Sequence, residues 1–205
     1  MSIDNYKTVK ELGLYIFEQE AQQQLYTHES QNYSLYEPRF NQMMKWTQLI
    51  KPKIVLDIFS SWGYFIKCLN EQFPSIIAHG LDGSLTKVEY CSNKEQTVIQ
   101  GDIRTMEPTQ VYDLVYFSDN LIYFPDPIYI GQKVAKWGKY VIFTTPLYSN
   151  EDDVQVLAID GLLQSYPQPE THFEIASLIG KMVEYTTIMS PTFGVRWACS
   201  LIEVL

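Results

Sequence analysis

The chain has 205 residues, which is enough for one domain with a full hydrophobic core and short for two. Hydrophobic residues make up 46% and charged residues 19%, the proportions of an ordinary globular protein, which argues against a disordered chain. The formal charge of −9, without a basic cluster, opposes nucleic-acid binding, and no apolar run reaches the roughly 18 residues of a membrane helix. We therefore expect no nucleic-acid partner and no membrane partner.

The cysteines and histidines show no metal-binding pattern. Cys68, Cys91 and Cys199 lie far apart, and the three histidines have no paired spacing. We expect reduced thiols and no metal site. The first residues, MSIDNYKTVKEL, lack the basic and apolar regions of a signal peptide, so we expect a cytoplasmic protein.

The N-terminal quarter of the chain is predicted to be helical. Residues 4–27 carry apolar side chains at roughly helical spacing, which predicts one or two helices. The polar, tyrosine-rich residues 28–39 are typical of a loop, and residues 40–50 of a helix that Pro52 ends. We interpret residues 1–50 as an N-terminal helical extension and residues 51–205 as the main domain.

The next stretch is a strand-turn-helix-strand unit, with an acidic residue at the end of each strand. Its elements are strand 54–58, turn 60–63, helix 64–72 and strand 76–81. Asp57 and Asp82 lie at the carboxyl ends of the two strands. Ligands of open α/β sheets bind at these strand ends, so we expect a site for a small polar molecule there.

Strands and helices continue to alternate until the C-terminal hairpin. The expected elements are helix 85–94, strand 97–100, strand 112–117, helix 128–136, strand 140–144 closed by Pro146, a possible helix 154–164, helix 172–179, and strands 182–189 and 196–205. The last two runs suit an antiparallel hairpin added to the edge of the sheet. The fold class is therefore α/β.

Four local motifs resemble the class I S-adenosylmethionine-dependent methyltransferases, over roughly residues 50–205, and in particular their small-molecule, type 11-like branch. They are VLDIFSSWGYF from residue 55, GLDGS from residue 80, QGDIR from residue 100 and YDLVYFSDNLIYFPDP from residue 112. The resemblance implies a Rossmann-like three-layer sandwich, with a mostly parallel seven-stranded sheet and a C-terminal antiparallel hairpin. It also implies S-adenosylmethionine as cofactor, and a lid in residues 20–45.

The resemblance implies roles for the acidic residues that follow the strands. Asp57 would meet the methionine ammonium, Asp82 the ribose hydroxyls and Asp102 the adenine amino group. The residues directly after two of these acids, Gly83 and Ile103, would line the adenosine site. For Asp57 and Asp82, a role in stabilising a turn is the alternative.

Candidates for contact with the methyl group and the substrate come later in the chain. Ser118 and Asp119 would lie beside both, unless they belong to a plain polar loop. A proton acceptor for the substrate would be Asp119 or His172. The alternative for His172 is a solvent-facing residue in the first turn of a helix.

The chain departs from the family in the glycine-rich turn. The family's three glycines fall at Phe59, Ser61 and Gly63, so the last alone is present. Glycine serves there for positive φ and for close approach of the backbone to the ligand. A phenylalanine at the first position occupies volume that the methionine tail of the cofactor approaches, whereas Ser61 is a milder change.

Three functional hypotheses follow. The first is a methyltransferase that transfers a methyl group from S-adenosylmethionine to a small molecule or a protein side chain. The second is a catalytically inactive protein of this fold, acting as a binding or regulatory partner. The third is a nucleotide-binding Rossmann oxidoreductase, because an acid after the second strand also binds ribose there; the single remaining glycine and the terminal hairpin count against it.

Overall fold

The computed structural model describes residues 37–118, 127–147, 157–159, 162–164, 169–189 and 196–205. Its main strands are β1 (Ile54–Ile58), β2 (Ile77–Asp82), β3 (Thr97–Gln100), β4 (Tyr112–Ser118), β5 (Gly138–Leu147), β8 (Lys181–Met189) and β9 (Arg196–Glu203). They form a seven-stranded sheet in the order β3-β2-β1-β4-β5-β9-β8. The first five strands are parallel, so their carboxyl ends share one edge of the sheet, which we call the carboxyl edge.

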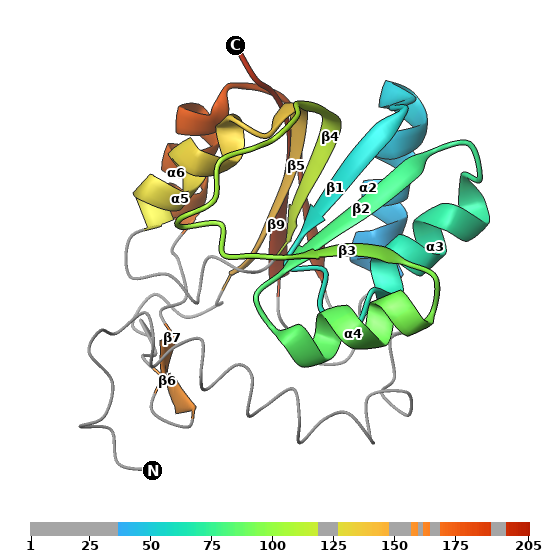
Figure 1. The fold of residues 1–205 in the computed structure, drawn as a ribbon. Helices are drawn as coiled ribbons and strands as arrows, with labels where there is room; N and C mark the ends of the chain where they lie inside the picture. The colour runs from blue at the N-terminus through green and yellow to red at the C-terminus, as the bar shows by residue number, and fades with distance from the viewer. Residues whose placement is uncertain (1–36, 119–126, 148–156, 160–161, 165–168, 190–195) are drawn as a thin grey trace.

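Helices cover both faces of the sheet (Figure 1). The helices α2 (Glu37–Ile50), α3 (Tyr64–Gln72) and α4 (Leu85–Asn93) lie on one face, and α5 (Pro127–Ala135) and α6 (Pro169–Ile179) on the other. Side chains of a strand alternate between the faces: Val55 packs in the core under α2 and α3, whereas Leu56 and Ile58 pack in the core under α5 and α6. The predicted three-layer α/β fold is confirmed.

The helix α2, placed by the sequence in the N-terminal extension, packs against the sheet. Its side chains Met43, Met44 and Trp46 are buried in the same core as Val55. The Thr47 hydroxyl donates to the Met43 carbonyl, so its contact with Tyr116 is a hydrogen bond that Tyr116 donates. Most of the predicted lid, residues 20–45, and the helices predicted within residues 4–27 lie outside the described residues.

The C-terminal hairpin is antiparallel, as predicted, but β5 is longer than predicted. β9 lies between β5 and β8 and runs antiparallel to both. The prediction that Pro146 closes β5 is wrong, because the strand continues to Leu147 with Pro146 opposite Trp197. The pairing of β5 with β4 ends at Thr144, so the missing N–H of Pro146 interrupts no ladder on that side.

The helix predicted over residues 154–164 is also wrong where the structure describes it. Two short strands, β6 (Leu157–Ile159) and β7 (Leu162–Gln164), pair there as a separate antiparallel sheet. The sequence contains the signal for this arrangement, because Asp-Gly at residues 160–161 between two apolar runs favours a two-residue hairpin loop.

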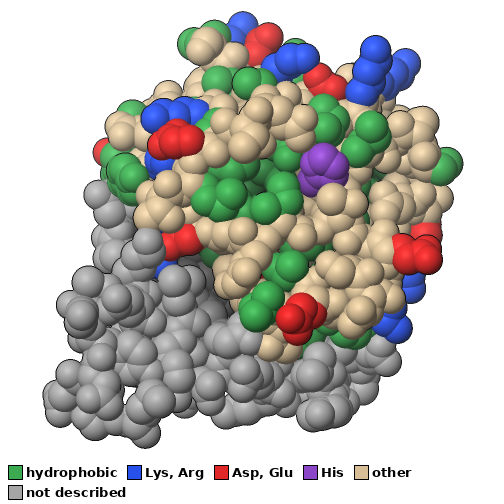
Figure 2. All heavy atoms as spheres, viewed as in Figure 1, with side chains coloured by type: hydrophobic (Ala, Val, Ile, Leu, Met, Phe, Trp, Pro, Cys, Tyr) green, Lys and Arg blue, Asp and Glu red, His purple; other side chains and the backbone are tan. Residues whose placement is uncertain are grey.

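The surface of the described residues shows no concentration of positive charge on the side in Figure 2. Apolar side chains gather near the middle of this side, and Lys and Arg lie around its rim together with Asp and Glu. Among the helices that the structure describes, none is long and apolar enough to cross a membrane.

Candidate functional site

The turn after β1 adopts the conformation that three glycines would provide. Phe59, Ser61 and Gly63 have φ values of 63°, 51° and 69°, all in the left-handed region. This region costs a non-glycine residue roughly 1–2 kcal/mol, so the backbone here must be held by its surroundings. The N–H groups of Phe59 and Ser60 donate to the Leu81 carbonyl at 2.7 and 3.2 Å, which ties the turn to β2.

Asp82, at the end of β2, holds both this turn and the next. Its Oδ2 accepts from the Ser61 N–H at 2.8 Å, and its Oδ1 accepts from the Ser84 N–H at 2.9 Å, across Gly83. The side chain is only 6% exposed. The turn-stabilising role weighed for Asp82 is therefore present, and each carboxylate oxygen keeps a lone pair for a further donor.

Asp57, at the end of β1, is a buried carboxylate without a hydrogen bond in the described part of the chain. It is 6% exposed, so little of the carboxylate reaches water. Burial, and then repulsion from Asp82, raise the pKa of Asp57 to about 8, while Arg39 acts in the opposite direction. A turn-capping role for Asp57 is not what the contacts show, because no described N–H donates to it.

Arg39, which the sequence analysis did not identify, is a buried cation that acts to lower the pKa of Asp57. It belongs to the first turn of α2, is 5% exposed, and its guanidinium lies 5.2 Å from the centre of the Trp197 ring and 5.3 Å from that of Phe40. The sequence contains a signal for its position. The link from Ile50 to β1 is short, so α2 must run antiparallel to that strand. The start of α2, and therefore Arg39, must lie at the carboxyl edge.

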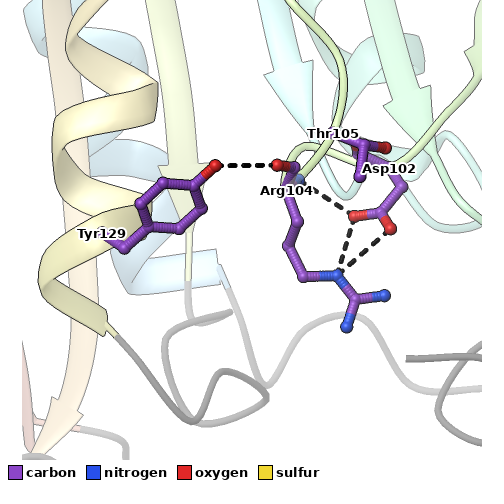
Figure 3. A network of polar contacts seen from close by, with 4 residues as sticks. All are labelled: Asp102, Arg104, Thr105 and Tyr129. Carbon is purple, nitrogen blue, oxygen red and sulfur yellow. Dashed lines mark hydrogen bonds and ion pairs between the residues drawn. The ribbon is translucent and has the colours of Figure 1, made fainter. Parts of the chain in front are cut away.

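Asp102, after β3, is engaged by a neighbouring arginine (Figure 3). Its Oδ1 accepts from the backbone N–H and from Nε of Arg104, both at 2.9 Å, and its Oδ2 from the same Nε at 3.1 Å. The Tyr129 hydroxyl reaches across from α5 and donates to the Arg104 carbonyl at 3.0 Å. Ile103, between the two, is 1% exposed and belongs to the core under α5 and α6.

Phe59 and Ser118 complete the described carboxyl edge. The Phe59 ring is half-buried and lies 6.5 Å from the ring of Phe117, near the end of β4. Ser118, the last residue of β4, shares a hydrogen bond of 2.9 Å with the Thr144 hydroxyl of β5. Asp119 lies outside the described residues, so its role stays a prediction.

His172 is not the surface residue that the sequence suggested as the simpler interpretation. The ring is fully buried, its Nδ1 is 2.9 Å from the Thr145 hydroxyl, and its Nε2 is 2.8 Å from the Ser200 hydroxyl. It also stacks on Phe143, with 4.5 Å between ring centres. Both nitrogens are engaged inside the protein, so a role as proton acceptor, which stays a prediction, would require this packing to open.

Metal ligands do not gather anywhere in the described ranges. No group of three or more His, Cys, Asp or Glu side chains there is placed to hold a metal ion.

Comparison with solved structures gives long alignments at low identity. A Nostoc punctiforme protein described as an O-methyltransferase aligns with a TM-score of 0.65 and 16% identity, over 82% of this chain and 56% of its own. The magnesium protoporphyrin IX methyltransferase of Synechocystis, with bound S-adenosylhomocysteine, aligns with a TM-score of 0.65 and 12% identity, over 83% and 84% of the two chains. This chain has the class I methyltransferase fold.

The class I fold does not by itself define an activity. The cyclase SpnF also aligns, with a TM-score of 0.61 and 12% identity, over 78% of this chain and 80% of its own. No protein-family model and no curated protein matches the sequence. The function must therefore be argued from the site itself.

Within the class I fold, the predicted site residues divide into two groups. Asp57, the turn 59–63 and Asp82 lie together, because adjacent parallel strands end there and Asp82 bonds to the turn. Asp102 lies one strand further along, and its carboxylate is bound to Arg104.

Proposed function

We propose that the chain is an S-adenosylmethionine-dependent methyltransferase that acts on a small molecule or a protein side chain. The observation that carries this proposal is the Asp57 carboxylate, which is buried and without a hydrogen bond among the described residues. A buried ionised carboxylate is costly unless a cation or hydrogen-bond donors accompany it. The ammonium of the methionine group of the cofactor would supply both.

The residues around Asp57 fit the rest of that methionine group. An α-amino acid presents an ammonium and a carboxylate on the same carbon, so it needs an acid and a base near one another. Asp57 and the buried Arg39 guanidinium, which influences the pKa of Asp57, offer such a pair. We assign Arg39 to the carboxylate because a guanidinium binds carboxylates with several donors at once.

The adenosine part would extend from Asp82 toward Asp102. The free lone pairs of Asp82 would accept from the ribose hydroxyls while its bonds to Ser61 and Ser84 persist. Gly83, between Asp82 and Ser84, leaves room for the sugar. Asp102 would accept from the adenine amino group only beside its existing partner Arg104, and Ile103, which is buried in the core under α5 and α6, would support this segment from within the protein.

The cofactor, when bound, supplies a methyl group that its positively charged sulfur already activates. The residues of the chain then need to hold the two reactants in line and exclude water. Ser118 would border the methyl group, and Asp119, the next residue, would accept the proton of an oxygen or nitrogen nucleophile. His172 would do so only if its buried position opened.

Calorimetric titration with S-adenosylmethionine, S-adenosylhomocysteine and NAD tests the proposal. We expect the first two to bind and NAD not to bind. Arg39→Gln should weaken S-adenosylmethionine at least about tenfold, the loss of a charged hydrogen bond, and 5′-methylthioadenosine, which lacks the amino-acid group, far less. The control is Arg196→Gln, an exposed arginine at the start of β9, which should change neither affinity.

A second candidate is a non-catalytic protein of this fold that serves as a binding partner. Two observations favour it: Phe59 replaces a turn glycine, and Arg104 already engages the Asp102 carboxylate. Under this hypothesis a folded sample binds neither sulfur-containing nucleoside. Micromolar binding of either one would support the methyltransferase instead.

A further inference from the structure

Phe59 introduces an aromatic ring at the carboxyl edge, where the class I sequence pattern has a glycine. Its backbone is left-handed, with φ of 63°, and the bond from its N–H to the Leu81 carbonyl holds this backbone against β2. The ring is half-buried, and the fully buried Phe117 ring lies behind it at 6.5 Å. The ring is thus a firmly held surface between the ends of β1 and β4.

The charges beside Phe59 favour a cation. Asp57 lies two residues before it, and Asp82 binds the turn of which it is part. A cationic ligand group that passes this ring meets the negative face of an aromatic ring and, bound to the same turn, the Asp82 carboxylate, and both attract positive charge.

We propose that Phe59 is a specificity-determining residue whose ring contacts the sulfonium of the cofactor, so that the site prefers the charged methyl donor to its neutral product. This inference rests on the proposed methyltransferase function. In the transfer, the sulfur–methyl bond breaks with its electron pair remaining on sulfur, and a bond from the acceptor to the methyl group forms. The sulfur thereby loses its charge, and the attraction to the ring ends when the reaction does.

The opposite role for the same ring would be that of a plug. A side chain that fills the volume left by the glycine weakens S-adenosylmethionine and S-adenosylhomocysteine alike, because the two ligands differ by one methyl group and one charge. The two roles differ in the ratio of the affinity for S-adenosylmethionine to that for S-adenosylhomocysteine. A ring that acts as a plug leaves this ratio unchanged, whereas a ring that contacts the cation raises it.

The experiment measures both dissociation constants for the wild-type protein and for Phe59→Leu, which keeps apolar bulk and removes the ring. We expect the Phe59→Leu variant to bind S-adenosylmethionine about two- to thirtyfold more weakly, the range of a cation–aromatic contact, with S-adenosylhomocysteine within about twofold. Phe59→Tyr should keep the wild-type ratio. Phe73→Leu, a half-buried aromatic residue at the end of α3, is the matched control and should change neither constant.

The other possible outcomes contradict either the cation contact of Phe59 or the proposed function. Equal weakening of both ligands in Phe59→Leu, or tighter binding of both, overturns the cation contact while leaving the methyltransferase proposal intact. Binding of neither ligand by the folded wild-type protein overturns the proposed function, and the inference with it. Thermal melting establishes that each variant is folded, and Phe59→Met replaces Phe59→Leu if the latter does not fold.

Discussion

At the scale of single residues, Asp57 and Asp82 look alike in sequence but differ in their contacts. Each follows a strand and each is 6% exposed. Asp82 accepts two backbone hydrogen bonds, whereas Asp57 accepts none from the described residues. One acid therefore supports the fold, and the other has no such backbone partner in the described part of the chain.

Asp57→Asn should stabilise the ligand-free protein and weaken cofactor binding. The pKa of Asp57 rises from 3.8 to about 8 on folding, so the folded state holds a proton that the unfolded state releases, and wild-type stability falls as pH rises between these values. Asparagine removes this loss, and we expect a gain of about 1–3 kcal/mol at pH 8. Thermal unfolding without ligand, at pH 5 and pH 8, measures it.

Asp82→Asn is the matched control for this prediction. The amide group of asparagine keeps one acceptor oxygen, so the N–H of Ser61 or of Ser84 loses its partner. We expect a loss of about 1–3 kcal/mol of unfolding free energy, opposite in sign to Asp57→Asn. A loss of stability in both variants would show that Asp57 is a structural residue too.

At the scale of elements, the turn after β1 has left-handed backbone conformations at two residues that are not glycine, Phe59 and Ser61. Ser61→Gly should stabilise the protein by up to about 1 kcal/mol, because glycine has no steric penalty at the φ of 51° that Ser61 adopts. The larger loss of backbone entropy by glycine on folding limits this gain. Ser75→Gly is the control, because the exposed Ser75 has no positive φ and should gain nothing. Urea unfolding of the wild type and the two variants measures the difference in unfolding free energy. An equal effect in both variants would contradict a strained backbone at Ser61.

The element α6 contributes a buried histidine, which makes stability depend on pH. Burial lowers the pKa of His172 from 6.5 to about 4, so below pH 6.5 the unfolded state gains a proton that the folded state refuses. We expect wild-type stability to fall by at most about 3 kcal/mol from this group as pH drops from 6.5 to 4. His172→Gln should reduce the slope in urea unfolding across this range; an unchanged slope would assign it to other groups.

At the scale of the whole molecule, the sheet is protected at its centre and exposed at the β8 edge. β1 and β4 are buried between helices on both faces, whereas the side chains of β8 are mostly exposed, among them Val183 and Met189. We expect amide hydrogen exchange to be slowest in β1, β4 and β5 and faster in the two edge strands, β3 and β8. Protection of β8 equal to that of β4 would indicate that another chain covers this edge.

Most of the fold could be predicted from the sequence, because its signals are local. Apolar runs, Pro52, Pro74 and the Asp-Gly pair at residues 160–161 act on neighbouring residues, so they mark where elements begin and end. The two wrong predictions, the helix over residues 154–164 and the strand end at Pro146, concern local signals of this kind. Apolar spacing predicts a helix across the Asp-Gly pair, where the structure has two strands, and Pro146 predicts a strand end, although an outer position of the ladder tolerates proline.

The sequence by itself determined the order of the seven strands of the main sheet and of helices α3 to α6, the turn after β1, and the placing of Asp57 and Asp82 at strand ends. The tertiary structure alone decided which charged and polar groups interact: Arg104 bonds to Asp102, His172 bonds to Thr145 and Ser200, and the buried Arg39 lowers the pKa of Asp57. The physical reason is the separation along the chain of the residues that interact. Hydrophobic periodicity and turn chemistry depend on neighbours along the chain, whereas burial and charge pairing depend on side chains that the fold brings together from distant segments.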